Sequence, residues 1–198
     1  TVKVAEKILQ DLLAGNQRFL QGSAKGKVWQ ARNRNAGQSP KAIVLGCADS
    51  RVPIETIFDQ GPGDLFVIRV AGNIAAPSQI GSIEFAVENF SVPLVIILGH
   101  THCGAIEATM TTLETNSSVE SDNLKSIIDY IAPAIAELCS TKTPQDQRTF
   151  QCLLANIRGS ANRLQQDSTI LANLIASGQL AVVSAYYDID LGTVNIID

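Results

Sequence analysis

The sequence predicts an α/β fold with a central, mainly parallel β-sheet of four strands plus an edge strand, flanked by helices. Short apolar runs bounded by Gly or Pro recur along the 198-residue chain, as expected for strands covered on both faces. Segments with helical spacing of apolar residues separate these runs, and this alternation typically builds a parallel sheet. Because 45% of the residues are hydrophobic and no repeat or linker interrupts the chain, we expect a single domain over residues 1–198.

The first elements form an N-terminal helical arm, residues 1–36, ahead of an α/β core, residues 37–198. Apolar residues at helical spacing predict an amphipathic helix over 2–21. We expect this helix to pack on a partner subunit, because later helical segments are predicted to cover the sheet. The polar segment 31–40 is predicted to be a loop that leads into the first strand, 42–46.

The remaining elements alternate in the same way. Further strands are predicted from three apolar runs: 65–70, 94–99 and 180–186. Helices are predicted from apolar spacing in the intervening segments: 78–90, 104–113, 124–138 and the long stretch 145–177. The polar residues 111–123 are typical of a surface excursion, and 192–197 fits an antiparallel edge strand. Parallel strands end at one edge of the sheet, and that edge is where open α/β sheets bind ligands.

The charge pattern argues against several classes of partner. The chain carries 15 Lys and Arg against 19 Asp and Glu, and its basic residues are scattered. We therefore expect no binding to nucleic acid or to an anionic membrane. The longest strongly apolar run, 93–99, is far shorter than the roughly 20 residues that a membrane span requires.

Cysteine usage bears on the compartment. The four Cys residues form no CxxC pair, and Cys139 and Cys152 are expected to be small buried residues unless the protein is exported. We expect a cytoplasmic location. Because the chain begins at Thr1 rather than Met, a removed export signal and a periplasmic location stay open.

Soft metal ligands stand at the ends of two predicted strands. Cys47 follows the strand 42–46, while His100 and Cys103 follow the strand 94–99. Two thiolates and an imidazole suit Zn²⁺ better than any oxygen-seeking ion. Three protein ligands leave a fourth position open, as in catalytic zinc sites, so this set predicts chemistry on a water held by the metal.

His102 is the rival to His100 as a ligand. We prefer His100, because it lies three residues before Cys103 and the pair converges on one side of a first helical turn. His102 is expected to be solvated or to lie behind the ligands, and a proton-shuttle role stays open. A closed structural zinc site would need a fourth ligand from Cys139, Cys152 or His102, and none has a convincing spacing.

Asp49 and Arg51 follow the first Cys and are two residues apart, on one side of an extended chain. They can form an ion pair. A carboxylate held by Arg51 is oriented and kept ionised, and it can accept a hydrogen bond from zinc-bound hydroxide. A plain surface ion pair is the alternative interpretation, and it is less favoured so close to a metal-ligand cysteine.

Three motifs carry a family resemblance: CADSRVP at 47–53, PGDLFVIRVAGN at 62–73, and GSIEFAVENF followed by LGHTHCGAI up to Ile106. In this order and spacing they resemble the β-class carbonic anhydrases. The resemblance implies reversible hydration of carbon dioxide to bicarbonate and a proton by zinc-bound hydroxide. It implies one Zn²⁺ per subunit and a homodimer or tetramer of dimers with the active site at the dimer interface.

The resemblance also assigns residues. Cys47, His100 and Cys103 would bind zinc, with Asp49 and Arg51 as the dyad beside the fourth position.

Five further residues are assigned to substrate. By resemblance, Gln38 matches an amide donor, Phe66 and Phe85 match aromatic wall residues, and the backbone N–H of Gly104 faces bound substrate. Ala71 is added because the pocket of a small apolar substrate should be lined by apolar groups. Plant-type members carry Tyr where this chain has Phe85, so the ring is kept without its hydroxyl.

Some bacterial members place the dyad Asp on zinc in a closed state, using a Trp to bind bicarbonate. Val44 occupies that position here, and the only Trp, Trp29, lies outside the motifs. We therefore expect an open state at neutral pH, although Gly46 matches the switching members. Because two thiolates neutralise zinc, activity is expected to rise from about pH 7 to about pH 9.

Two other functions stay open at this point. A relative on this scaffold could hydrolyse carbonyl sulfide or carbon disulfide with the same hydroxide, since selectivity would depend on pocket width. A non-catalytic bicarbonate- or zinc-binding protein would not need the pair formed by Asp49 and Arg51, so the presence of that pair disfavours this alternative.

Overall fold

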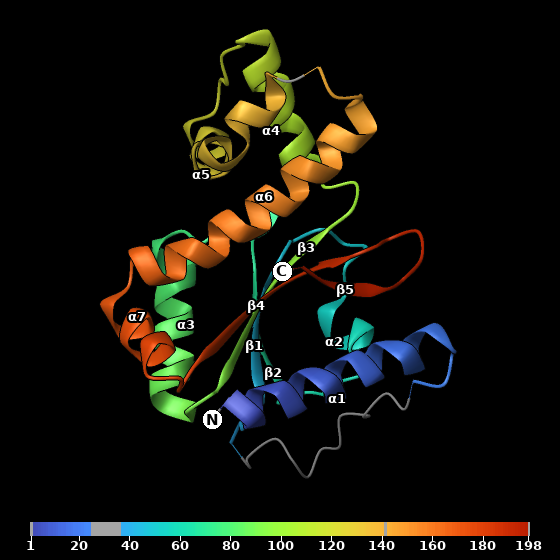
Figure 1. Cartoon of the computed structure of the whole chain (residues 1–198), viewed down its shortest axis with the longest axis vertical. Helices are drawn as coiled ribbons and strands as arrows, with labels where there is room; N and C mark the ends of the chain where they lie inside the picture. The colour runs from blue at the N-terminus through green and yellow to red at the C-terminus, as the bar shows by residue number, and fades with distance from the viewer. Residues whose placement is uncertain (1, 25–36, 141, 198) are drawn as a thin grey trace.

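The chain folds around a five-stranded sheet with the strand order β2-β1-β3-β4-β5, as seen in a computed structural model (Figure 1). The structure describes residues 2–24, 37–140 and 142–197. The strands are β1 (Ala42–Gly46), β2 (Leu65–Arg69), β3 (Leu94–His100), β4 (Ala181–Tyr187) and β5 (Val194–Ile197). The first four strands are parallel and β5 pairs antiparallel with β4, so the predicted sheet and its edge strand are confirmed.

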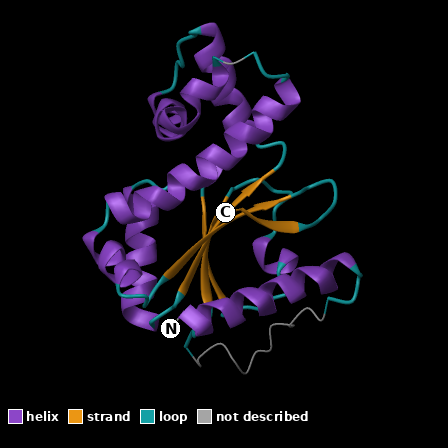
Figure 2. Ribbon diagram, in the orientation of Figure 1, coloured by secondary structure: helices purple, strands orange, loops and turns teal. Residues whose placement is uncertain are grey.

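The two central strands are buried along their whole length. Every residue of β1 and β3 is buried, whereas β2 at the edge and β4 are only partly covered. A strand that is wholly apolar in sequence can be covered on both faces at no polar cost. Helices surround the sheet and provide this cover (Figure 2).

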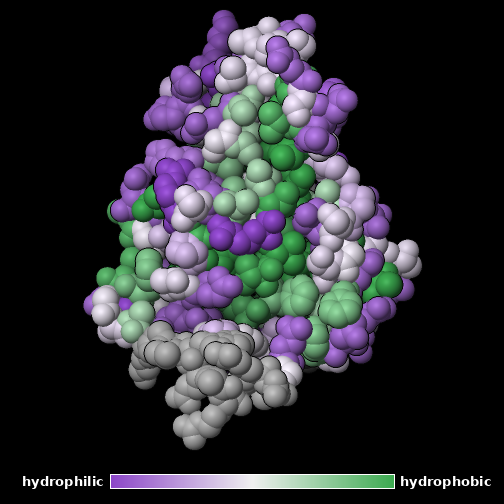
Figure 3. Space-filling model, turned by 180° about the vertical axis from the view of Figure 1, so that it is seen from behind, coloured by the Kyte–Doolittle hydropathy of each residue, from purple (hydrophilic) through white to green (hydrophobic). Residues whose placement is uncertain are grey.

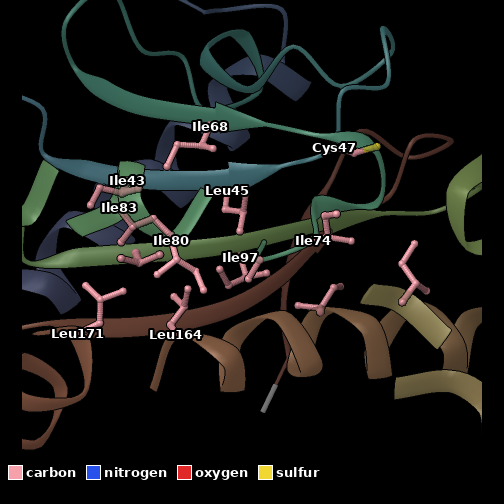
Figure 4. Packing of buried hydrophobic residues seen from close by; sticks show 14 of the residues in the cluster. Ile43, Leu45, Cys47, Ile68, Ile74, Ile80, Ile83, Ile97, Leu164 and Leu171 are labelled. Carbon is pink, nitrogen blue, oxygen red and sulfur yellow. The ribbon is translucent and has the colours of Figure 1, made fainter. Parts of the chain in front are cut away.

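A large apolar cluster joins one face of the sheet to five helices (Figure 4). They are α3 (Pro77–Phe90), α4 (Gly104–Thr115), α5 (Asp122–Cys139), α6 (Gln145–Gln166) and α7 (Thr169–Ala176). The cluster reaches Cys47 at the carboxyl end of β1, so the metal-ligand loop rests on the main core.

The opposite face is covered by α1 (Val2–Leu20) and the short helix α2 (Ile54–Ile57). Leu12 of α1 is 1% exposed, and Asn16 donates to the Gly192 carbonyl at 3.0 Å and accepts from the Val194 N–H at 3.0 Å. The later helices thus leave this face free, contrary to the argument from which we expected α1 to pack on a partner. Contact with a partner remains a prediction for the exposed side of α1.

Three details of the sequence prediction are wrong. The stretch 145–177 is two helices, because Ser168 accepts a hydrogen bond from the Leu171 N–H at 3.1 Å and starts α7. The polar residues 111–123 are not one excursion, because α4 continues to Thr115 and α5 starts at Asp122. Neither α2 nor the 3₁₀ turn over Ala71–Asn73, labelled η2, was predicted.

Among the helices of the described ranges, none combines the length and the apolar character needed to cross a membrane.

Candidate metal centre

The sheet topology places the candidate metal ligands together. β1 lies between β2 and β3, so the chain leaves β1 toward β2 and leaves β3 in the opposite direction, toward β4. Gly46 is in register with Leu98, which brings the residues that follow both strands to one edge. Such a switch point is where open α/β sheets form ligand sites, as the sequence predicted.

The atoms of Cys47, His100 and Cys103 gather within 4.8 Å of one another, and all three residues are buried. The ligand atoms of a tetrahedral zinc ion lie about 3.5 to 4 Å apart, so a small closure would complete the set. No fourth His, Cys, Asp or Glu among the described residues joins this group. The arrangement therefore matches an open, three-ligand site rather than a closed structural one.

The imidazole of His100 fits a metal ligand. Its Nδ1–H donates to the Thr101 carbonyl at 2.8 Å, which leaves the lone pair on Nε2. The side chain is 0% exposed, yet Nε2 has no hydrogen-bond partner in the described part of the chain. A buried acceptor without a partner is costly, and a cation between the two sulfurs would satisfy it.

The two sulfurs are electrostatically unequal without a cation. A hydrogen bond from Cys103 lowers the pKa of Cys47, and backbone N–H groups of Asp49 and Gly72 act in the same direction. The same bond, with burial, raises the pKa of Cys103, so one proton is shared between the sulfurs. Binding of a dication would release that proton, because zinc binds thiolates.

Helix α4 begins beside Cys103, which is its N-cap residue. Backbone N–H groups of Ile106 and Ala105 lower the pKa of this cysteine against the larger effects of Cys47 and burial. The N-terminus of α4 therefore favours the thiolate form of Cys103.

Asp49 and Arg51 form the predicted pair in detail. Arg51 donates to one carboxylate oxygen through its backbone N–H and Nε, at 2.9 and 3.0 Å, and to the other through Nη2 at 2.8 Å. These bonds lower the pKa of Asp49 well below its usual range, so the carboxylate stays ionised. Its Oδ2 lies 3.9 Å from the His100 Nε2, at the edge of the metal site.

His102 stands outside the ligand set, as predicted. Its ring is exposed and Nε2 lies 2.9 Å from the Asp190 carboxylate, while its backbone carbonyl accepts from Arg51 Nη2 at 3.0 Å. The residue adopts a left-handed backbone conformation with φ 56°, which is uncommon for a residue other than glycine.

Sequence reasoning missed Arg69, the last residue of β2. Its Nε donates to the Cys47 carbonyl at 2.9 Å and its Nη2 to the Asp49 carbonyl at 2.6 Å, so it ties the metal loop to the neighbouring strand. A charged residue at the end of an apolar strand could have indicated this role. The groups that Arg69 contacts are backbone carbonyls, however, and no residue type in the sequence marks a carbonyl as a partner.

The predicted substrate residues do not gather around this metal centre. Ala71 lies in the turn after β2, and Gly104 begins α4, so both stand at the metal edge. Phe66 pairs in register with Ile43, four residues before Cys47, so roughly 13 Å of strand separates it from the metal edge. A cavity of about 260 Å³ beside the metal ligands, between α4 and α6, is lined by none of the five predicted residues.

Gln38 precedes β1 at the opposite end of the sheet from the metal. Phe85 lies on α3 and is 51% exposed, with its ring centroid 6.3 Å from that of Phe66. Gln38, Phe66 and Phe85 therefore lie far from the metal ligands of their own chain.

The fold and the site together define a zinc enzyme of the α/β class, with three protein ligands, an open position and an oriented carboxylate. The chain belongs to the carbonic anhydrase family, in its β class: residues 42–194 match the family model described as carbonic anhydrase.

Individual relatives agree. The carbonic anhydrase of Mycolicibacterium smegmatis is 36% identical over 196 residues, covering 97% of this chain and 91% of that protein. Carbonic anhydrase 2 of Mycobacterium tuberculosis is 34% identical over 184 residues, covering 91% and 87%. The solved structure of the β-carbonic anhydrase CcaA superposes with a TM-score of 0.73 at 25% identity, covering 96% of this chain and 95% of that one.

Proposed function

We propose that this chain hydrates carbon dioxide reversibly to bicarbonate and a proton, with Asp49 and Arg51 acting beside a zinc ion held by Cys47, His100 and Cys103. The observation that carries the assignment is the Asp49 carboxylate. It is fixed by three hydrogen bonds from Arg51, and its Oδ2 lies 3.9 Å from the His100 nitrogen left free for the metal.

The zinc ion, when bound, acts as a Lewis acid that activates water as the nucleophile. Asp49 orients that water. Arg51 engages both carboxylate oxygens and keeps Asp49 ionised, so a remaining lone pair accepts a hydrogen bond and directs the oxygen toward the substrate carbon. The Gly104 N–H at the start of α4 is available to one substrate oxygen, because the first N–H groups of a helix have no partner within it.

Arg51 also favours the open state that the sequence predicts. Moving Asp49 onto the metal would require the carboxylate to give up at least part of its bidentate pairing with Arg51. Val44 lies wholly buried in β1, so no aromatic side chain extends from this position to bind bicarbonate.

We further propose that a second copy of the chain completes the substrate pocket. Gln38, Phe66 and Phe85 stand at the far end of β1 and β2 from their own metal ligands, so they can serve a metal site only across an interface. Phe66, Phe85 and Phe90 form an aromatic cluster with centroids 5.9 to 6.3 Å apart beside the edge strand β2.

The surface supports such an assembly. On the face in Figure 3, apolar side chains gather in a broad area across the middle of the molecule, and exposed apolar area of this kind marks contact surfaces. A homodimer, or a tetramer of dimers, would cover it. Sedimentation of the purified chain tests the assembly: a monomer at assay concentration that hydrates carbon dioxide at full rate would contradict it.

A cytoplasmic location is also proposed, since the four Cys residues make no disulfide framework. Fractionation of producing cells would test it, and recovery from an exported fraction would contradict it.

Stopped-flow hydration of carbon dioxide tests the function directly. We expect turnover that is abolished by a zinc chelator and restored by added Zn²⁺. The same instrument with carbonyl sulfide as substrate tests the alternative hydrolase, which would be favoured if only that substrate reacted.

A further inference from the structure

Gly72 connects a metal-binding sulfur to a distant helix. Its N–H donates to Cys47 Sγ at 3.3 Å, and its carbonyl accepts a hydrogen bond from Asn156 Nδ2 at 2.9 Å. Asn156 lies on α6, 84 residues further along the chain, and is 2% exposed. A continuous line of hydrogen bonds therefore runs from the core face of α6 to the Cys47 sulfur.

The backbone of Gly72 has little freedom to redirect its N–H. It adopts φ 69° and ψ 15°, a left-handed conformation that favours glycine. A Cβ at this position would lie 2.8 Å from Ile131 Cδ1 and 3.2 Å from Ala105 Cβ, so neighbouring helices press on the turn. Within these limits, the hydrogen bond from Asn156 to the Gly72 carbonyl is a side-chain contact that fixes the orientation of the turn, beside the backbone hydrogen bond from Asn73 N–H to the Val70 carbonyl.

Asn156 places a buried polar amide on the apolar face of α6. Around it, α6 contributes buried apolar residues to the main core: Cys152, Leu153, Ile157 and Leu164. A buried polar side chain costs free energy unless it is hydrogen-bonded, and an apolar residue of similar volume would pack without that cost. The amide is explained by what it holds, which is the Gly72 carbonyl.

A hydrogen bond to a metal thiolate changes the metal's chemistry. The N–H withdraws negative charge from the sulfur, so the thiolate donates less to the cation and the cation polarises its other ligands more strongly. Loss of such outer contacts typically changes metal affinity or activity by about 10- to 100-fold.

We propose that Asn156 is a positioning residue for the zinc centre, which aims the Gly72 N–H at Cys47 Sγ and thereby sets the electron donation of that sulfur. This role requires the zinc site but not turnover, so it is tested separately from the proposed reaction. Asn156 does not touch the metal ligands itself. It acts through one backbone residue.

The test uses the cobalt-substituted full chain, whose thiolate-to-cobalt charge-transfer absorption reports the charge on sulfur. Asn156→Leu removes the donor while keeping the branch at Cγ, and Asn156→Ala removes it with less steric demand. We expect both to move the band to lower energy and to raise the pH midpoint of hydration, because the sulfur donates more charge to the metal. We also expect both to change zinc affinity roughly 10-fold in chelator competition. Asn156→Gln, which keeps an amide, should restore part of each change.

Ser160→Ala is the matched control, because Ser160 is a buried polar residue one turn further along α6, at 4% exposure. It should leave the cobalt band and zinc affinity unchanged. The proposal is overturned if Asn156→Ala or Asn156→Leu folds with the parental cobalt spectrum and zinc affinity. It is also overturned if Ser160→Ala shifts the band as far, since the effect would then be general to the core. If neither donor-free variant folds, Asn156→Gln decides the question. An unshifted cobalt band in that variant, when hydrogen exchange shows that the Gly72 N–H has lost its protection, would overturn the proposal as well.

Discussion

The metal half and the substrate half of this active site are built differently. The three metal ligands are buried, meet at one edge of the sheet and come from two neighbouring strands of one chain. The residues assigned to substrate by resemblance are split, because Gln38, Phe66 and Phe85 stand at the opposite end of the strands and Gln38 and Phe85 are exposed. A single chain can therefore assemble the metal centre, whereas the pocket is expected to need a second copy.

The largest effect should come from removing a metal ligand. In His100→Ala the two sulfurs remain but the set falls to two ligands, so we expect loss of stoichiometric zinc and of hydration by several orders of magnitude. Elemental analysis and stopped-flow assays measure both. Gln38→Ala is the control variant, because Gln38 lies at the opposite end of the strands from the metal ligands. It should keep one zinc ion per chain. Parental zinc content in His100→Ala would show that His100 is not a ligand.

The dyad should be separable from the metal. Asp49→Asn keeps the shape of the side chain but removes the charge, so we expect zinc to stay bound while kcat/KM falls by about 10²- to 10³-fold. Because Arg51 lowers the pKa of Asp49, the carboxylate is ionised throughout the assay range, and the rise of activity above pH 7 should not be its titration. Zinc loss in Asp49→Asn would instead assign a ligand or folding role.

Mixing two impaired variants tests whether Gln38 serves its own chain or the partner. Gln38→Ala should lose about 10-fold in activity as a pure protein, and Asp49→Asn more. If Gln38 serves the partner's metal site, a mixed dimer has one intact site, and random pairing gives about one quarter of parental activity. If Gln38 serves its own chain, no site in the mixture is intact, and co-refolded material would stay near the average of the two variants.

The sequence was most informative where a whole element or motif had one role. β1 and β3 were predicted to within one residue because complete burial leaves an uninterrupted apolar run. Likewise, Cys47, His100 and Cys103 lie at or shortly after the carboxyl ends of strands, and parallel strands end at a common edge. The break before α7 was missed because apolar spacing continues through it, while a single Ser168 side chain caps the new helix.

Contacts made through the backbone could not be predicted. Arg69 binds the carbonyls of Cys47 and Asp49, and Asn156 binds that of Gly72, so neither partner has a side chain that marks the pairing. These contacts join residues 20 to 84 positions apart, and only the folded arrangement brings them together. The metal half therefore depends on more of the chain than its motif reveals.

The smallest expected effect concerns a second cysteine pair, Cys139 and Cys152, which can be compared with the metal-binding pair Cys47 and Cys103. Cys139 ends α5 and Cys152 is buried on α6, and no third metal ligand joins them among the described residues. Burial raises the pKa of Cys152 to about 12, with Cys139 adding to the rise, so this sulfur is a neutral thiol in the fold. In the unfolded chain a Cys ionises near pH 8.5. Its contribution to stability is therefore complete below about pH 8.5 and is lost as the pH rises toward 12.

Cys152→Ala removes this titration at the cost of a small cavity. At pH 8 we expect the parent to be more stable by about 1 kcal/mol, because the lost sulfur leaves unfilled volume. Between pH 9 and pH 11 the difference in unfolding free energy should shrink by up to about 1.4 kcal/mol per pH unit and then reverse, because only the parent pays for keeping this thiol neutral. Urea titrations of both proteins at matched zinc concentration measure the difference, and the ionising groups that do not contact Cys152 cancel between them. If the difference in unfolding free energy did not depend on pH, Cys152 would ionise as readily in the folded as in the unfolded chain. The expected contrast between the metal-binding cysteine pair and a buried neutral pair would then be wrong.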